Sequence, residues 1–204
     1  MAGAAEAAGY PAPAREARAE LRERGSRFLA VLAPAASEEA ARQALAALAA
    51  EHPDASHHCW AFRLGWPPLE RSSDAGEPAG TAGVPILQVL RGAGLSDAVA
   101  VVARWFGGTK LGKGGLARAY AGAVREALAE LPVVRRVPAV ELEVELPYER
   151  LGAVKRLVRP PAVEIREAAY GEVVRLTLSV HEAARSALEA ALADLGLSAR
   201  EGRG

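Results

Sequence analysis

The sequence predicts an α+β protein of two domains, and three observations support this. Short strand patterns alternate with helical patterns in the first part of the chain, where Val99–Ala103 is an apolar run typical of a central strand covered on both faces. Pro132 and Pro138 bracket a short connection. Beyond it, the order strand, helix, strand, strand, helix matches the split-βαβ, ferredoxin-like plan. We therefore expect a flexible N-terminal tail over residues 1–13, a first domain over 14–137 and a second over 138–204.

Periodicity places the elements of the first domain. Ser37 is a predicted helix N-cap because acids follow it at the next two positions. Pro85 is compatible with a helix only in the first turn. The expected elements are strands over Arg15–Glu23 and Ser26–Ala33, a helix from Ser37 to about Ala50, a strand over His57–Leu64 with one strongly apolar face, a loop with Pro67 and Pro68, a helix around Ile86–Leu90, the strand over Val99–Ala103 and a helix ending near Leu131.

The second domain begins with a strand in which apolar residues alternate with three glutamates. We expect a helix over about Glu149–Val158, a hairpin turning at Tyr170-Gly171 and a last helix over about Glu182–Leu195. The open face of this sheet should carry Glu141, Glu143 and Glu145. It lacks the aromatic residues of an RNA-recognition sheet, so it is interpreted as a solvated face or a protein contact.

Composition is that of a globular protein: half of the 204 residues are hydrophobic, and 25 bases balance 25 acids. Without net charge, any attraction to nucleic acid must come from a local patch. No apolar run approaches the roughly 20 residues of a membrane span, and the start has no secretory signal, so a cytoplasmic location is expected. The absence of asparagine and the excess of arginine over lysine fit a thermophile or a GC-rich genome.

The candidate site lies between Asp74 and Tyr120. Two glycine-rich turns each lead into a helix, whose first backbone N–H groups favour an anion. Five bases and no acid lie between Ala98 and Arg125. The predicted phosphate or nucleic-acid contacts are Arg104, Gly107, Gly108, Lys110, Lys113, Gly114, Gly115 and Arg118, with Asp74, Glu77 and Thr81 in support.

Residues Gly107–Lys113 match G-x-x-x-x-G-K, but Gly114 stands where a P-loop needs a Ser or Thr for Mg²⁺. A phosphate cradle without hydrolysis is the favoured interpretation, and a tight strand-to-helix turn is the simpler alternative.

Three other groups suggest chemistry at first sight. Asp74 and Glu77 could form a metal or base site, but an ion-pairing or loop-bracing role with Arg104 or Lys110 is favoured. In His57-His58-Cys59 at most two side chains converge, which is too few for zinc, so packing is expected. We assign no catalytic residue, no metal site and no cofactor.

Four stretches together resemble the IMPACT/YigZ family: HHCWAFRL, DAGEPAGTAGVPIL, VVARWFGGTKLGKGGLARAY and the βαββα tail. The similarity runs from about Ser26 to Leu195. The family pattern does not fix Lys113, and its usual paired acid before Gly76 is here Asp74-Ala75, so one carboxylate is missing. This counts against a metal role for the turn.

The resemblance implies a first domain with the fold shared by a small-subunit ribosomal protein, domain four of elongation factor G and the GHMP kinases. That fold has a left-handed βαβ crossover, an exception to the usual handedness. The second domain is similar to elongation factor G domain five. Eukaryotic members of the family regulate translation initiation through protein contacts.

Three functions follow as hypotheses. The first is a translation-associated regulatory binding protein that contacts RNA, the ribosome or a phosphate-bearing ligand through the basic loop. The second is an enzyme on a small phosphorylated or carboxylated ligand, using Asp74 and Glu77. The third is a module that binds a protein of the translation machinery without nucleic acid, through Trp105, Phe106 and Tyr120 if these are exposed.

Overall fold

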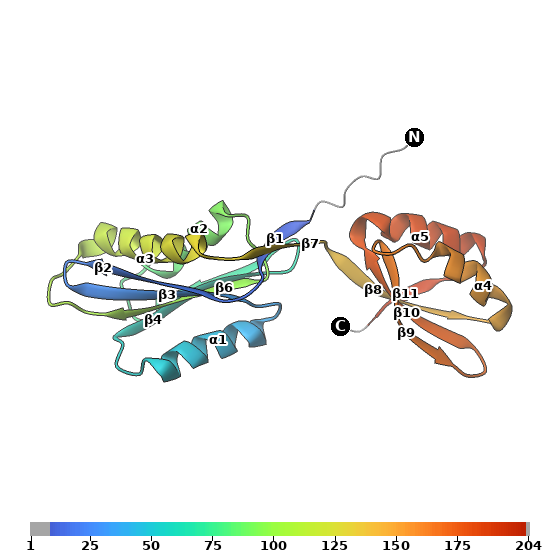
Figure 1. The fold of residues 1–204 in the computed structure, drawn as a ribbon, viewed down its shortest axis with the longest axis horizontal. Helices are drawn as coiled ribbons and strands as arrows, with labels where there is room; N and C mark the ends of the chain where they lie inside the picture. Colours follow the sequence, from blue (N-terminus) through green and yellow to red (C-terminus); the bar gives the residue numbers. More distant parts are fainter. Residues whose placement is uncertain (1–8, 203–204) are drawn as a thin grey trace. The chain divides into compact units, whose positions relative to one another are not determined.

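The computed structural model describes residues 9–202 and shows a mixed α+β protein, as predicted (Figure 1). Contacts divide the chain into two units, one over Tyr10–Arg136 and the other from Val137 onward. Within the described residues, no helix is long and apolar enough to cross a membrane.

The first unit is built on a five-stranded antiparallel sheet with the order β2-β3-β6-β4-β5. Strand β6 lies in the centre and is buried from Ala98 to Arg104, which confirms the central strand predicted from its apolar run. The strands are β2 (Ala17–Glu23), β3 (Ser26–Pro34), β4 (His57–Leu64), β5 (Leu69–Ser73) and β6 (Ala98–Trp105).

Helices cover both faces of this sheet (Figure 1). Helix α1 (Glu38–Glu51) packs on one face, and its predicted N-cap is confirmed, since the Ser37 Oγ accepts the Ala40 N–H at 3.1 Å. Helices α2 (Gly83–Gly92) and α3 (Gly112–Ala129) pack on the other. Strands β3 and β4 both run antiparallel to β6 and are therefore parallel to each other, so α1 connects them as a βαβ crossover.

Two edge elements differ from the prediction. Residues Leu69–Ser73, expected in a loop, form the edge strand β5. Residues Tyr10–Pro13, expected in a flexible tail, form β1, which pairs antiparallel with β7 (Val133–Arg136). The Tyr10 hydroxyl donates to Asp97 at 2.8 Å, and Arg136 binds the same carboxylate at 2.7 Å. Residues 1–8 of the predicted tail lie outside the described residues.

The expectation of a single apolar face on β4 was incomplete. Cys59 and Ala61 face the cluster under α2 and α3, whereas Phe62 and Leu64 face the cluster under α1. Both faces of β4 carry apolar side chains because α1 covers one face of the sheet, and α2 and α3 cover the other.

The second unit is a four-stranded antiparallel sheet with the order β11-β8-β10-β9, covered by two helices. This is the ferredoxin-like order, and β11, which was not predicted, completes it as βαββαβ. Its elements are β8 (Ala139–Leu146), α4 (Tyr148–Leu157), β9 (Val163–Tyr170), β10 (Val174–His181), α5 (Glu182–Asp194) and β11 (Ala199–Glu201).

Candidate functional site

The basic glycine-rich stretch forms the connection from β6 to α3. The strand ends at Trp105 and the helix begins at Gly112, so the second half of the predicted Gly107–Gly115 loop is already the first turn of α3. Gly108 and Gly112 have φ values of 84° and 70°, a left-handed conformation that glycine adopts without strain. The glycines therefore shape a short, sharply bent loop.

The start of this loop is fixed against the rest of the sheet. The N–H of Phe106 donates to Ser56 Oγ at 3.3 Å, and the N–H of Gly107 donates to Ser26 Oγ at 3.2 Å. Gly107 also lies directly on the hairpin turn between β2 and β3. A Cβ added to Gly107 would sit 1.8 Å from the carbonyl carbon of Gly25. The loop backbone thus has a defined position before any ligand arrives.

The N-terminus of α3 is open. Its N-cap, Leu111, has no side-chain oxygen, and the first turn contains no acid. Lys110, Lys113 and Arg118 are exposed around it, and in the described part of the chain none of the three makes an ion pair. Unsatisfied N–H groups, the positive end of the helix dipole and cationic side chains together favour an anion.

Arg118 lies one helical turn after Gly114. Its Nη1 is 3.4 Å from the position that a Cβ on Gly114 would take, so the guanidinium leans back toward the start of the helix. The structure therefore gathers Lys113, Gly114, Gly115 and Arg118 on the first turns of α3, with Gly107, Gly108 and Lys110 in the loop before it.

The N-terminus of α2 is already filled by the chain itself. The carboxylate of Asp74 accepts N–H groups from Gly80 at 2.8 Å, Ala82 at 2.9 Å and Gly83 at 2.8 Å. Burial acts to raise the pKa of Asp74, but the three N–H donors outweigh it and hold that pKa below its usual value. Only one of the two predicted anion cradles is therefore available.

Arg104 has a different role from the phosphate contact that the sequence suggested. Its Nη1 binds Glu77 Oε1 at 2.5 Å, and with exposed fractions of 6 % and 8 % both residues are buried. Tyr120, which is fully buried, donates its hydroxyl to the same Glu77 oxygen at 2.7 Å. This ion pair ties the turn before α2 to the end of β6, and it confirms the predicted bracing role of Glu77.

Cys59 completes this buried network. Its Sγ lies 3.3 Å from the Tyr120 hydroxyl and 2.9 Å from the carbonyl oxygen of Asp74. Burial raises the pKa of the Cys59 thiol to about 12, and it also raises that of the Tyr120 hydroxyl. A thiol held neutral in this way is a packing group, not a nucleophile.

The remaining supporting residues are also engaged internally. The Thr81 Oγ1 donates to the Pro78 carbonyl at 2.7 Å, and His57 Nδ1 lies 2.9 Å from the carbonyl oxygen of Ala75. Among residues 9–202, no group of three or more His, Cys, Asp or Glu side chains is placed to hold a metal ion. Asp74, Glu77 and Thr81 thus all make hydrogen bonds within the turn and to the elements beside it.

The aromatic residues of the third hypothesis separate into three environments. Tyr120 is buried, and Trp105 is half-buried with its Nε1 donating to Asp54 at 2.8 Å. Phe106 alone of the three is exposed, at 52 %. In the sequence, Phe106 stands directly after the end of β6 and before two glycines.

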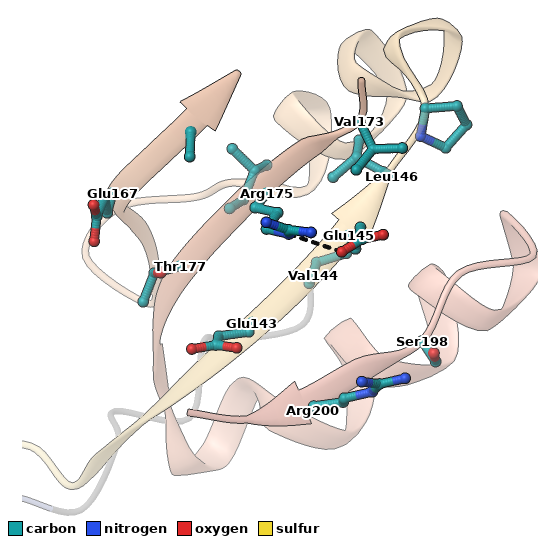
Figure 2. Close-up of a pocket in the computed structure, with 13 residues that line it drawn as sticks. Glu143, Val144, Glu145, Leu146, Glu167, Val173, Arg175, Thr177, Ser198 and Arg200 are labelled. Atoms are coloured by element: carbon teal, nitrogen blue, oxygen red, sulfur yellow. Dashed lines mark hydrogen bonds and ion pairs between the residues drawn. The ribbon is translucent and has the colours of Figure 1, made fainter. Parts of the chain in front are cut away.

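The second unit has a hollow on the open face of its sheet, with a volume of about 640 Å³ (Figure 2). Glu143, Glu145 and Glu167 line it together with Arg175 and Arg200. Arg175 Nε binds Glu145 at 2.8 Å, as the dashed line in Figure 2 marks. The predicted glutamate face is confirmed, since the alternate residues Leu142, Val144 and Leu146 are buried on the opposite side.

Comparisons with known proteins cover both units. The profile of the Impact N-terminal domain matches residues 24–128, and that of a domain of unknown function, DUF1949, matches residues 144–196. The IMPACT family member YigZ of Escherichia coli (strain K12) is 40% identical over 172 residues, which are 83% of this chain and 84% of that protein.

Two further similarities agree with this match. The IMPACT family member in pol 5'region of Thermus thermophilus is 47% identical over 154 residues, covering 75% of this chain and 83% of that one. A crystal structure of a hypothetical protein superposes with a TM-score of 0.73 at 35% identity, covering 96% of this chain and 98% of the other.

Proposed function

The chain belongs to the IMPACT family, and from this premise we propose that it is a translation-associated regulatory protein that binds RNA, free or in the ribosome, through the start of α3. The observation that carries the proposal is the open helix N-terminus with three exposed cations that make no ion pair among the described residues. Backbone N–H groups and Lys or Arg side chains are the usual contacts to phosphate oxygens.

The size of the site sets the expected strength. Lys110, Lys113 and Arg118 can neutralise about three phosphates, so the logarithm of the affinity should fall with the logarithm of salt with a slope of roughly −2 for a single strand. Arg104 no longer contributes, because Glu77 neutralises it. Binding by the isolated protein is therefore expected to be weak and readily reversed by salt.

The test is RNA binding by fluorescence anisotropy at low and moderate salt. The wild type is compared with Lys110→Ala/Arg118→Ala, and the matched control is Lys155→Ala/Arg156→Ala, which removes the same charge from exposed residues of α4 in the second unit. We expect weaker binding and a smaller salt slope only in the first variant. Equal affinity of the two variants would overturn the proposal.

A second candidate function is a protein contact through the second unit, and the hollow that carries Glu143 and Glu167 favours it. A basic segment of a translation protein would complement Glu143 and Glu167, which make no ion pair among residues 9–202. Pull-down from nuclease-treated lysate with the wild type and with Glu143→Lys/Glu167→Lys tests it. A translation protein retained by the wild type and lost by the variant supports this function; equal retention contradicts it.

A further inference from the structure

Phe106 is an exposed aromatic residue placed beside the proposed phosphate site. Its exposed fraction is 52 %, and within the described part of the chain it joins none of the three apolar clusters. The neighbouring Trp105, by contrast, packs against the cluster under α1. Phe106 therefore contributes little to the folded core.

The backbone that carries the Phe106 ring is held in place by hydrogen bonds. The N–H groups of Phe106 and of the next residue are bound to Ser56 and Ser26, and Gly107 is locked against Gly25. A loop whose backbone is already fixed does not lose backbone conformational entropy when a ligand binds. The aromatic ring is thus prepared for contact.

The defined neighbours of the ring are a buried guanidinium on one face and a glycine that follows it in the loop. The guanidinium of Arg104 lies over the ring, 5.7 Å from its centroid, and the same guanidinium lies 5.5 Å from the centroid of Phe28. Gly108 follows in the loop, and a Cβ added there would meet nothing within 4 Å. Gly108 itself therefore places no side chain beside the ring.

Building on the proposed function, we propose that the ligand is single-stranded RNA, with an unpaired base stacked on Phe106 and its phosphates at the start of α3. A base can stack on an aromatic side chain only where it is unpaired and splayed out, as in single strands, loops and bulges. The pairing of one aromatic platform with a short row of cations is the arrangement that single-strand binding proteins use. A duplex offers only its phosphates to this surface.

The test measures the affinity of the full chain for a 12-nucleotide single-stranded RNA and for a 12-base-pair RNA duplex. Phe106→Ala should weaken single-strand binding about 5- to 100-fold, the cost expected for one stacked base. Phe106→Trp should retain the affinity, and Phe106→Leu, which keeps an apolar side chain without a π face, should lose it like alanine. The salt slope should stay unchanged in all three, because no phosphate contact is removed.

The outcomes separate this inference from the proposed function. If Phe106→Ala binds the single strand like the wild type while Lys110→Ala/Arg118→Ala does not, the stacking inference is overturned and phosphate binding stands. Equal affinity of the wild type for strand and duplex also overturns it. If neither RNA binds and a protein is captured only when Phe106 is intact, both proposals fail. Because Phe106 is exposed, unchanged thermal unfolding of the three variants controls for folding.

Discussion

Helices α2 and α3 both begin after a glycine-rich turn in the sequence, but a side chain caps the first N–H groups of α2 and not those of α3. At α2 the carboxylate of Asp74 binds three of the N–H groups in and just before the first turn. At α3 the cap residue is Leu111, and exposed lysines flank it. A glycine-rich helix start is therefore free to bind an external anion only when no acid of the chain caps it.

The largest effect on stability is expected from replacing Glu77, which holds the turn before α2 to the end of β6. Glu77→Ala leaves Arg104 charged and buried without its partner, which should lower the free energy of unfolding by about 3–5 kcal/mol. Urea denaturation measures it. The double variant Glu77→Ala/Arg104→Met should recover much of this loss, since no unpaired charge then remains. A Glu77→Ala variant as stable as the wild type would show that the pair braces nothing.

Asp74→Ala should come next, with a loss of about 0.5–2 kcal/mol in the free energy of unfolding, because it removes the cap of α2. RNA affinity should stay at the wild-type value, since Asp74 serves the other helix. Parallel measurement of denaturation and RNA binding checks both. A gain in RNA affinity would mean that α2 also becomes an anion site once its own carboxylate is gone.

The stabilisation by Asp74 should depend on pH in a defined direction. Its folded pKa lies below the ordinary value of 3.8, so its contribution is complete above about pH 4 and is lost as the pH falls through the folded pKa. The difference in unfolding free energy between the wild type and Asp74→Asn should be constant from pH 7 to 5 and shrink below 4. A difference that grows toward low pH would contradict the N–H cap.

The smallest effect on stability, with the opposite sign, is expected at α3. Lys113→Glu places an acid in the first turn, where the helix dipole favours it by about 0.3–1 kcal/mol. The same change should weaken RNA binding, so stability and affinity move in opposite directions. Lys155→Glu, in the last turn of α4, is the control and should alter neither RNA binding nor α3. A Lys113→Glu variant with wild-type affinity would remove this helix start from the proposed site.

Elements with a regular apolar pattern could be predicted from the sequence, whereas the edge strands β5 and β11 and the short strand β1 could not. The run at β6 and the alternation in β8 follow directly from burial on two faces and on one. Strand β5 reads LERSS and β1 reads YPAP, so neither has an apolar period. Their pairing depends on partners that only the folded chain supplies, such as β7 for β1. Such strands are set by long-range contacts that no local pattern records.

The composition of the site and the ion-pairing role of its acids were predictable, but the choice of partner was not. The sequence placed five bases near two helix starts, and the loop-bracing role of Glu77 was expected. It could not show that Arg104, which lies 27 residues from Glu77, turns inward to that acid while Lys110 stays exposed. Arg104 still lies on β6, where its direction is set by the strand, whereas Lys110 lies in the loop beyond the end of the strand.

The contact between Gly25 and Gly107 limits which substitutions this protein can accept at either position. Each residue already has the smallest side chain, so a substitution at one position cannot be relieved by trimming the other. In a genetic selection, a lesion at Gly107 should revert to glycine and should yield no intragenic suppressor at Gly25. We therefore expect glycine to be retained at both positions. The contact joins segments that are far apart in the sequence, since Ser26 and Gly107, which share a hydrogen bond there, are separated by 81 residues.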